Sequence, residues 1–452
     1  MDQRAQTVFS AYKFLSRVAK CRGGVVAVVI HRNMALPSRE LVFRQPPQRE
    51  CALEGGKSWS HGLSAGPLRH SKMRLGFALG AAVALATLSS AHTVFTTLFI
   101  DDVNQGDGTC VRMPKDPNTC TDPVESLTSQ DMACGRDGET AVKFSCPAPA
   151  GAKLTFEFRE WANLEQPGAI DASHKGPCAV YLKPMGSMAT DAAAGPGWFK
   201  IWDAGYDAAA GRWCTEQLIA NNGLLSVALP AGVPTGYYLV RPELLALQEA
   251  ENGDPQFYVG CAQLFIQGQQ TAATALRVPA AMQATIPGDV AARDPSVTFN
   301  IYAKPLALPY TVPGPRPFAP QDAAARRRHL GGGSSRGGRR DAGAAQTEGA
   351  VPAGCLLKNA NWCGAEVPAY TDEAGCWAAS DDCYKQQAAC YDAAPPTGSK
   401  GCDKWGTKCD AIQAACGDGR WVGPPGKGQK LGDVEAPVPG PIPPVAAQAQ
   451  GG

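Results

Sequence analysis

The stretch KLTFEFREW at residues 153–161 alternates apolar and polar residues with a period of two. This alternation predicts a half-buried β-strand, because successive side chains of a strand point to opposite faces. Short apolar runs of the same kind follow, separated by Gly, Pro and Asn: GLLSVALP (223–230), GYYLVRPELLAL (236–247), QFYVGCAQLFI (256–266) and SVTFNIY (296–302). No long amphipathic helix interrupts them, so residues 92–318 are predicted to form an all-β antiparallel sandwich with long loops.

A second stretch, MRLGFALGAAVALATLSSA at residues 73–91, has the pattern of a secretory signal peptide. Cleavage after Ala91 would make His92 the first residue of a secreted, extracellular protein. Because such a signal must lie at the N-terminus when it emerges, we interpret residues 1–72 as a disordered extension of the gene model. The alternative is a membrane anchor or buried helix at Leu75–Leu88, behind a genuine N-terminal domain.

The chain has 452 residues, 17 of them cysteine, and a formal net charge of +1. So many cysteines suit an oxidising, extracellular compartment. The near-neutral charge gives no reason to expect nucleic acid or a membrane surface as a partner, and a monomer is expected. Outside Leu75–Leu88, no apolar run approaches the ~20 residues that span a bilayer.

Two segments after the sandwich have the composition of chain that forms no packed core. Residues 319–350 are rich in Gly, Ser and Arg, which predicts a flexible linker. In an alternative interpretation, the basic runs of this linker contact anionic surfaces. Residues 422–452 are rich in Pro and Gly and are predicted to be a disordered tail. Between these segments, residues 351–421 form a separate module with eight cysteines.

This module contains an internal repeat, CWAASDDCYKQQAAC at 376–390 and CDKWGTKCDAIQAAC at 402–416. Each copy spaces three cysteines seven residues apart, so on a helix they lie nearly on one stripe. Two antiparallel helices would allow a set of disulfides: Cys376–Cys416, Cys383–Cys409 and Cys390–Cys402, with Cys355–Cys363 remaining. Eight cysteines allow 105 pairings. A zinc site is the competing use, but the CxxC spacing is missing.

Histidine is scarce, and the predicted sandwich contains only His92 and His174. The free α-amine and the Nδ1 atom of an N-terminal His92 would close a chelate ring around one metal ion. A second imidazole from His174 would give three nitrogen ligands in roughly one plane, an array that suits Cu(II). The amine loses its proton readily near neutral pH. Zinc would accept the same ligands.

Six blocks of the predicted sandwich are distinctive: HTVF (92–95), FREWANLEQPGAIDASHKGPCAVYLKP (158–184), PGWFKIWDAGYD (196–207), GYYLVRPELLALQ (236–248), PQFYVGCAQLFI (255–266) and YTVPGPRPF (310–318). In this order, across residues 92–318, they resemble the fungal lytic polysaccharide monooxygenases of auxiliary activity family nine, formerly glycoside hydrolase family sixty-one. The resemblance implies an immunoglobulin-like β-sandwich that carries one copper ion on a flat face.

The resemblance also implies a role for each residue of this copper site. His92 would supply the amine and Nδ1, His174 would supply Nε2, and Tyr258 would stand at the distant axial position. Gln256, two residues earlier on the same strand face, would hydrogen-bond the oxygen substrate. The chain departs from the family at Gln248, where a histidine is usual. Glutamine holds a hydrogen bond but carries no charge, so control of protonation is expected to be weaker.

For the disulfides of the sandwich, the resemblance implies a pair between Cys134 and Cys261. Cys146 and Cys178, each beside a predicted strand, form the second plausible pair. The sequence leaves two alternatives for the remaining three cysteines: Cys110 with Cys120, or Cys120 with Cys214.

Two sets of aromatic residues are candidates for contact with a polysaccharide. Tyr310 resembles a surface tyrosine of the family, and a flat aromatic there would stack on the apolar C–H face of a glucan ring. The alternative is an exposed tyrosine that binds nothing. In the module, Trp362, Trp377 and Trp405 form either a carbohydrate-binding face, which would target the cell wall or substrate, or the cap of a small core.

The resemblance implies a secreted copper-dependent monooxygenase that oxidatively cleaves β-1,4-glucan, with cellulose as the expected substrate and C1 slightly favoured over C4. Its co-substrates would be dioxygen or hydrogen peroxide and an external electron donor, either a small reductant or a secreted dehydrogenase. One rival is a non-catalytic copper-binding protein of the fungal cell wall. The other is a hydrolase with carboxylates such as Glu160 and Asp171, although no motif marks them as an acid and base pair.

Overall fold

The computed structural model describes residues 17–20, 26–29, 92–268, 277–318, 345–434 and 437–447. The predicted signal peptide and most of the predicted linker lie outside these ranges. The chain divides into two compact units, Met1–Leu85 and Ala86–Gly452. The first unit contains the antiparallel pair β1 (Arg17–Lys20) and β2 (Val26–Val29). Within the described ranges, no helix is long and apolar enough to cross a membrane.

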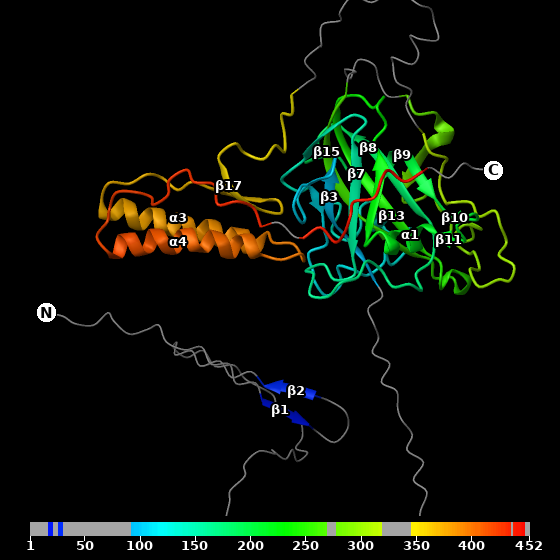
Figure 1. Ribbon diagram of the computed structural model, residues 1–452, viewed down its shortest axis with the longest axis horizontal. Coiled ribbons are helices and arrows are strands. Elements are labelled where there is room, and N and C mark those ends of the chain that lie inside the picture. The colour runs from blue at the N-terminus through cyan, green and yellow to red at the C-terminus, as the bar shows by residue number, and fades with distance from the viewer. Residues whose placement is uncertain are drawn as a thin grey trace, which may run out of the picture. The chain divides into compact units, whose positions relative to one another are not determined.

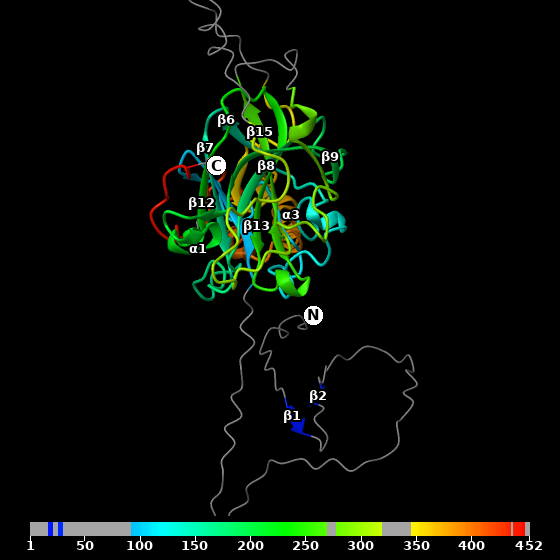
Figure 2. The same cartoon turned by 90° about the vertical axis from the view of Figure 1, so that its right-hand side faces the viewer.

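The second unit contains two β-sheets that pack face to face (Figures 1 and 2). One sheet has the order β12-β7-β3-β4, and the other has β16-β9-β8-β13-β15-β5, with β14 on β13 and β6 on β15. Neighbouring strands of both sheets are antiparallel, except that β6 runs parallel to β15 in the second sheet. The bounds are β3 Val94–Ile100, β4 Val103–Asn104, β5 Val111–Arg112, β6 Cys146–Pro149, β7 Lys153–Arg159, β8 Cys178–Met185, β9 Gly195–Ala204, β12 Leu224–Ala228, β13 Gly236–Ala246, β14 Gln256–Val259, β15 Cys261–Gln267 and β16 Gln283–Ile286. This architecture confirms the predicted all-β sandwich.

Short elements decorate the loops of the sandwich. The hairpin β10 (Tyr206–Asp207) and β11 (Arg212–Trp213) leads directly into the helix α1 (Cys214–Ala220). Single 3-10 turns lie at Gln130–Met132, Ala250–Asn252 and Ala280–Met282.

The core of the sandwich lies between the two sheets and consists of aromatic and branched side chains. Phe95 on β3 packs edge to face against Phe156 on β7, with ring centres 5.5 Å apart. From the other sheet, the fully buried Leu182, Val240 and Leu264 contribute to the same core. Removal of this apolar surface from water drives the packing of the sheets.

Strand β7 is buried on both faces, so the prediction of a half-buried strand is wrong. Thr155, Glu157 and Arg159 alternate with the core residues of β7, yet all three are buried. The Arg159 guanidinium pairs with Glu157 at 2.6 Å and with Asp107 at 2.8 Å. Asp107 comes from the short loop between β4 and β5. Buried charges that neutralise one another therefore take the place of solvent on this face of β7.

Two other predicted strands differ from the structure. SVTFNIY at 296–302 forms a turn instead of a strand, because the Asp294 carboxylate accepts hydrogen bonds from the amide and hydroxyl of Ser296. QFYVGCAQLFI is divided into β14 and β15 by Gly260, whose amide donates to the carbonyl of Pro242.

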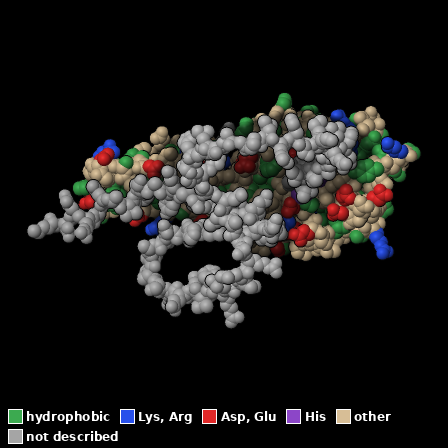
Figure 3. All heavy atoms as spheres, turned by 90° about the horizontal axis from the view of Figure 1, so that it is seen from below, with side chains coloured by type: hydrophobic (Ala, Val, Ile, Leu, Met, Phe, Trp, Pro, Cys, Tyr) green, Lys and Arg blue, Asp and Glu red, His purple; other side chains and the backbone are tan. Residues whose placement is uncertain are grey.

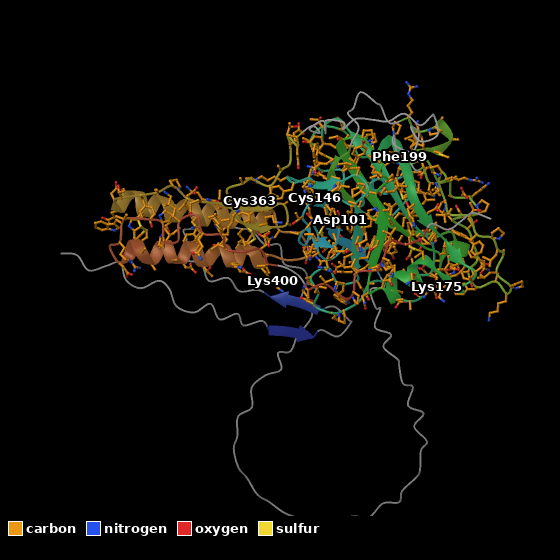
Figure 4. All side chains as sticks on the ribbon, turned by 45° about the horizontal axis from the view of Figure 1, so that its top comes forward. Asp101, Cys146, Lys175, Phe199, Cys363 and Lys400 are labelled. Atoms are coloured by element: carbon orange, nitrogen blue, oxygen red, sulfur yellow. A yellow bond between two sulfur atoms is a disulfide. The ribbon has the colours of Figure 1, made fainter. Side chains whose placement is uncertain are left out.

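The predicted disulfide between Cys134 and Cys261 is confirmed. The pairing of Cys146 with Cys178 is wrong, because the structure has two other bonds: Cys110–Cys146 and Cys178–Cys214. Across the sheet, Cys146 on β6 pairs with Leu264 on β15, Leu264 pairs with Tyr238 on β13, and Tyr238 pairs with Pro184 on β8. Cys146 is therefore level with Pro184, which lies six residues along β8 from Cys178. Six residues of strand span about 20 Å, far beyond disulfide reach. In Figure 4, Cys146 and Lys175, which is near Cys178, lie far apart on the sandwich.

The free cysteine of the described ranges is Cys120, so both alternatives for the three remaining cysteines are wrong. Its thiol is buried in the loop between β5 and β6. Burial raises the pKa of the Cys120 thiol to about 11, which keeps it protonated at neutral pH.

The cysteine-rich module contains a hairpin, β17 (Cys355–Asn359) and β18 (Trp362–Ala365), followed by two antiparallel helices. The helices are α3 (Glu373–Asp392) and α4 (Lys400–Gly417). All four predicted disulfides are present: Cys355–Cys363, Cys376–Cys416, Cys383–Cys409 and Cys390–Cys402. The seven-residue spacing therefore places three disulfides along one helix–helix seam.

Two parts of the predicted tail contact other elements in the structure. The amide of Leu431 donates to the carbonyl of Leu356 in β17. The amide of Ala446 donates to Ser226 in β12, and its carbonyl accepts the indole N–H of Trp202. The disorder expected from composition remains a prediction about the protein in solution.

We predict that Arg159→Met destabilises the sandwich by about 3–5 kcal/mol, because it leaves the Glu157 and Asp107 carboxylates without their cation. Denaturant unfolding of the mature chain measures the change. The control is Arg136→Met, which removes a partly exposed ion pair of 3.4 Å with Glu125 and should cost less than about 1 kcal/mol. Equal effects of the two substitutions would contradict the prediction.

Candidate metal centre

Three aromatic rings converge at the end of the sandwich where β3 begins. His92 lies two residues before β3, His174 lies in the loop before β8, and Tyr258 lies on β14. Their ring centres are 6.5 Å apart for His92 and His174, 6.1 Å for His92 and Tyr258, and 6.0 Å for His174 and Tyr258. Lys175, labelled in Figure 4, marks this end of the sandwich. The structure thus brings together the three residues that the sequence predicts as metal ligands.

The separation of the two imidazole rings is compatible with one shared metal ion. With a metal–nitrogen distance of about 2 Å, two imidazoles on one ion have ring centres no more than roughly 6.5 Å apart. Among the described residues, no group of three or more His, Cys, Asp or Glu is placed to hold a metal. A site here therefore depends on the α-amine of His92 as the third nitrogen. That amine becomes available only after cleavage of the bond to Ala91.

The loop that carries His174 is fastened to neighbouring elements on both sides. The amide of Leu247 donates to Lys175, and Gly176 exchanges backbone and side-chain hydrogen bonds with Thr215 at the start of α1. A Cβ atom at Gly176 would overlap the carbonyl oxygen of Leu245, so only glycine allows this close approach. The backbone therefore fixes the position of His174.

The His174 imidazole is suited to bind a metal as a neutral ligand. Burial lowers the pKa of His174, and the neighbouring His92 ring acts in the same direction, while Asp171 opposes them. Its Nδ1 atom lies 3.1 Å from the Ser173 hydroxyl. This contact leaves Nε2 as the nitrogen for a metal, as the sequence analysis expects.

Asp171 has a structural role in the turn before His174. Its carbonyl accepts the amide of His174, and its carboxylate accepts the amide of Ser173. The Ser173 hydroxyl, and after it the Ser173 amide, lower the pKa of Asp171. Burial raises the pKa of the nearby Glu160, and the charge of Asp171 adds to this shift. These contacts assign Asp171 to the support of a metal ligand.

A chain of side-chain amides lies beside the Tyr258 hydroxyl. Tyr258 donates to the Oε1 atom of Gln256 at 2.9 Å, and the Nε2 atom of Gln248 donates to the same oxygen at 2.7 Å. Burial raises the pKa of Tyr258, so its hydroxyl is protonated and can donate. The Oε1 atom of Gln248 is buried without a hydrogen-bond partner. An unpaired buried acceptor of this kind is suited to accept a proton donor that enters the site.

The sequence analysis missed Asp122, whose carboxylate lies 2.9 Å from the Nδ1 atom of His92. Backbone hydrogen bonds fasten its segment on both sides. The amide of Thr93 donates to Thr121, and the amide of Val124 donates to Phe257 on β14. Asp122 therefore has a fixed place beside the predicted ligand nitrogen. No local pattern distinguishes it from the other aspartates of this loop.

Tyr310, the candidate for stacking on a glucan ring, is only partly exposed in the structure. Its ring is half-buried and packs edge to face against Trp213 and Phe299, with ring centres 4.9 and 5.0 Å away. Its hydroxyl donates to the carbonyl of Ser296. Burial raises the pKa of Tyr310, and the residue serves the packing of its loop.

Comparisons with known proteins agree with the resemblance seen in the sequence. The model of Auxiliary Activity family 9 (formerly GH61) matches residues 92–310. AA9 family lytic polysaccharide monooxygenase C of Aspergillus tamarii is 52% identical over 350 residues, 77% of this chain and 91% of its own. AA9 family lytic polysaccharide monooxygenase H of Botryotinia fuckeliana is 48% identical over 366 residues, 80% of this chain and 82% of its own. The solved structure CvAA9A is 31% identical, covers 51% of this chain and all of its own, and has a TM-score of 0.45.

We predict that Asp122→Ala weakens Cu(II) binding of a mature chain that begins at His92 by about tenfold or more. The carboxylate competes for Nδ1 through a hydrogen bond worth about 1–3 kcal/mol. Its attraction to a doubly charged ion a few ångströms away is several kcal/mol even at an effective dielectric constant of about 20, so attraction dominates. Competition with a chelator of known affinity measures the change.

The matched control is Asp116→Ala, which removes an exposed carboxylate of the same loop and should leave the affinity unchanged. Tighter copper binding by Asp122→Ala would show that competition for the nitrogen dominates.

Proposed function

The chain belongs to Auxiliary Activity family 9, the copper-dependent lytic polysaccharide monooxygenases, and from this premise we propose that it is secreted and oxidatively cleaves β-1,4-glucan. We propose cellulose as the substrate, with oxidation at C1 or C4 and a slight preference for C1. The observation that carries the proposal is the triangle of His92, His174 and Tyr258, with ring centres 6.0–6.5 Å apart.

The amine and Nδ1 of His92 and Nε2 of His174 would hold the copper ion, with the Tyr258 hydroxyl close to it. Copper supplies one-electron redox chemistry, fed by an external reductant or a secreted dehydrogenase, to dioxygen or hydrogen peroxide. The protein's part is to hold the ligands rigidly. Backbone hydrogen bonds of Thr93 and of the loop around Gly176 support this role.

Gln256 and Gln248 are proposed to bind and orient the oxygen substrate. Both Tyr258 and Gln248 donate to the Oε1 atom of Gln256, which fixes the orientation of the Gln256 amide. Its Nε2 group donates one hydrogen to the Asp254 carboxylate at 3.3 Å and has a second hydrogen that can be donated to an oxygen substrate. The unpaired Oε1 atom of Gln248 offers an acceptor at the same place.

We propose the domain organisation that the sequence predicts. Residues 73–91 are a signal peptide, 92–318 the catalytic sandwich, 319–350 a linker and 351–421 the cysteine-rich module, while 1–72 and 422–452 are terminal extensions. The family match ends at residue 310, and the alignments with the two relatives cover 350 and 366 residues. An alignment longer than 310 residues must extend beyond residue 310, so both relatives share part of the region after the sandwich. This supports a module that belongs with the sandwich.

A non-catalytic copper-binding protein is the second candidate, because Gln248 stands where the family usually has a histidine. Release of oxidised cello-oligosaccharides from cellulose with copper and ascorbate tests the proposal. Copper binding without any oxidised product would favour the second candidate.

We predict that the secreted protein begins at His92 and that one alanine inserted before His92 abolishes oxidised products. The insertion moves the α-amine out of the chelate, and the loss of a ligand should weaken copper binding by at least about 100-fold. N-terminal sequencing and intact mass check the cleavage site. A matched insertion of alanine in the segment 319–344 should preserve activity, and an active chain with a shifted N-terminus would disprove the amine ligand.

We predict that Gln248→His raises peroxide-driven turnover by about tenfold and makes it fall as pH rises through the range near 6–7. A histidine there can donate a proton, and a positioned proton donor accelerates proton transfer. Initial rates between pH 5 and 8 measure the effect. Gln248→Asn, which retains an amide, is the control, and an unchanged rate and pH profile for Gln248→His would refute the idea.

A further inference from the structure

The helix α3 carries a row of three aromatic side chains: Trp377, Tyr384 and Tyr391. Each directly follows one of the three cysteines of α3, so they are seven residues apart. Two turns of an α-helix contain 7.2 residues, which places the three rings on nearly one stripe. Successive residues of this aromatic row are about 10.5 Å apart along the helix axis, because each residue adds about 1.5 Å.

Contacts with α4 hold the tyrosines of the row in place. The Tyr384 hydroxyl donates to Asp410 at 2.7 Å and to Gln413 at 3.0 Å. The Tyr391 hydroxyl donates to Asp403 at 2.5 Å. Tyr384 follows Cys383 and Asp410 follows Cys409, and these two cysteines form a disulfide. In the same way, Tyr391 and Asp403 follow the two cysteines of the Cys390–Cys402 disulfide. Each tyrosine thus crosses from α3 to α4 beside one disulfide, so the disulfides set its position.

The aromatic row is accessible to solvent. Trp377 is 40% exposed and Tyr391 is 44% exposed, while Tyr384 is half-buried. The exposed fractions are large for aromatic side chains, whose burial would be favourable.

The core of the module forms from other aromatic residues. Trp362 and Trp405 are buried and pack edge to face with ring centres 5.6 Å apart. Trp362 and Trp405 therefore cap a small core, and of the three tryptophans considered in the sequence analysis only Trp377 is exposed. Tyr384 packs against the edge of this core, while the rings of Trp377 and Tyr391 at the two ends of the row remain exposed.

We propose that the aromatic row of Trp377, Tyr384 and Tyr391 binds one extended β-1,4-linked glucan chain at the surface of cellulose. The axial interval of two helical turns is close to the length of two sugar rings in such a chain, after which the chain presents the same ring face again. Each aromatic ring would then stack on the apolar C–H face of every second sugar. The substrate class rests on the proposed function of the sandwich.

The charges beside the row fit an uncharged, hydroxyl-rich polymer. Asp403 and Asp410 border the tyrosines, and carboxylate oxygens accept hydrogen bonds from sugar hydroxyls. The same carboxylates disfavour acidic polymers through like-charge repulsion. On the face of the molecule drawn in Figure 3, both acidic and basic side chains are visible. The chain as a whole has a formal net charge of +1. Stacking with hydroxyl contacts, and not bulk charge, would therefore provide the binding.

The test measures binding of the copper-free mature chain to microcrystalline cellulose by depletion from solution, without reductant. We expect Trp377→Ala/Tyr384→Ala/Tyr391→Ala to bind at least about tenfold more weakly than the unsubstituted chain. Tyr384→Phe/Tyr391→Phe retains the rings, loses the hydroxyl contacts with α4, and should stay within about threefold. Lys385→Ala, an exposed substitution on the same helix, is the matched control. Disulfide mapping by mass spectrometry confirms the fold of each variant.

Unchanged binding of the triple alanine variant would overturn the proposal, and so would an equal loss in the phenylalanine variant, since stacking needs only the rings. Binding to chitin with none to cellulose would overturn the choice of glucan. Oxidised products from a soluble cello-oligosaccharide are measured in parallel. A chain without products whose cellulose binding depends on the row would refute the catalytic proposal alone.

Discussion

The buried guanidinium of Arg159 joins the segments that carry His92 and His174, the two histidines of the proposed metal centre. In the sheet, Arg159 lies opposite Val94, two residues after His92. Its Nη atoms donate to Thr97 on β3, to Asp107 in the loop between β4 and β5, and to the carbonyl of Ala162. The segment after Ala162 leads to His174. The Arg159 side chain is only 2% exposed, and the carboxylates of Asp107 and Glu157 neutralise its charge. A buried charge without its partners is strongly destabilising, so the segments that carry these residues must be in place together.

Much of the fold follows from local patterns that the sequence displays. The period of two in KLTFEFREW predicts β7, and the spacing of seven between cysteines predicts both helices and the three disulfides that join them, which leaves Cys355–Cys363 as the fourth pair. These predictions are confirmed because helix geometry alone decides which cysteines of the repeats can meet. In the sandwich, the distance between Cys146 and Cys178 depends on the register of several strands. Sequence proximity to a strand carries no information about which end of the sheet a cysteine occupies.

The proposed metal centre shows the same division between local and long-range information. His92, His174, Gln256 and Tyr258 are recognisable from their surrounding motifs, and the structure brings their rings and amides together. Asp122 has no such motif, since it reaches His92 through backbone contacts with strands that are distant in sequence. Tyr310 has a recognisable motif, yet its exposure depends on Trp213 and Phe299, which lie elsewhere in the chain.

The disulfides of the module have a consequence beyond stability. A binding surface that matches a polymer repeat is useful only if its spacing is rigid, since flexible side chains lose conformational entropy on binding. In this module, the residue after each α3 cysteine is aromatic, and two of the three aromatic residues are also hydrogen-bonded to α4. The bonds that hold the helices together therefore fix the interval between the rings. The sandwich and the module use one strategy, in which buried covalent or ionic contacts position side chains whose functional groups remain accessible.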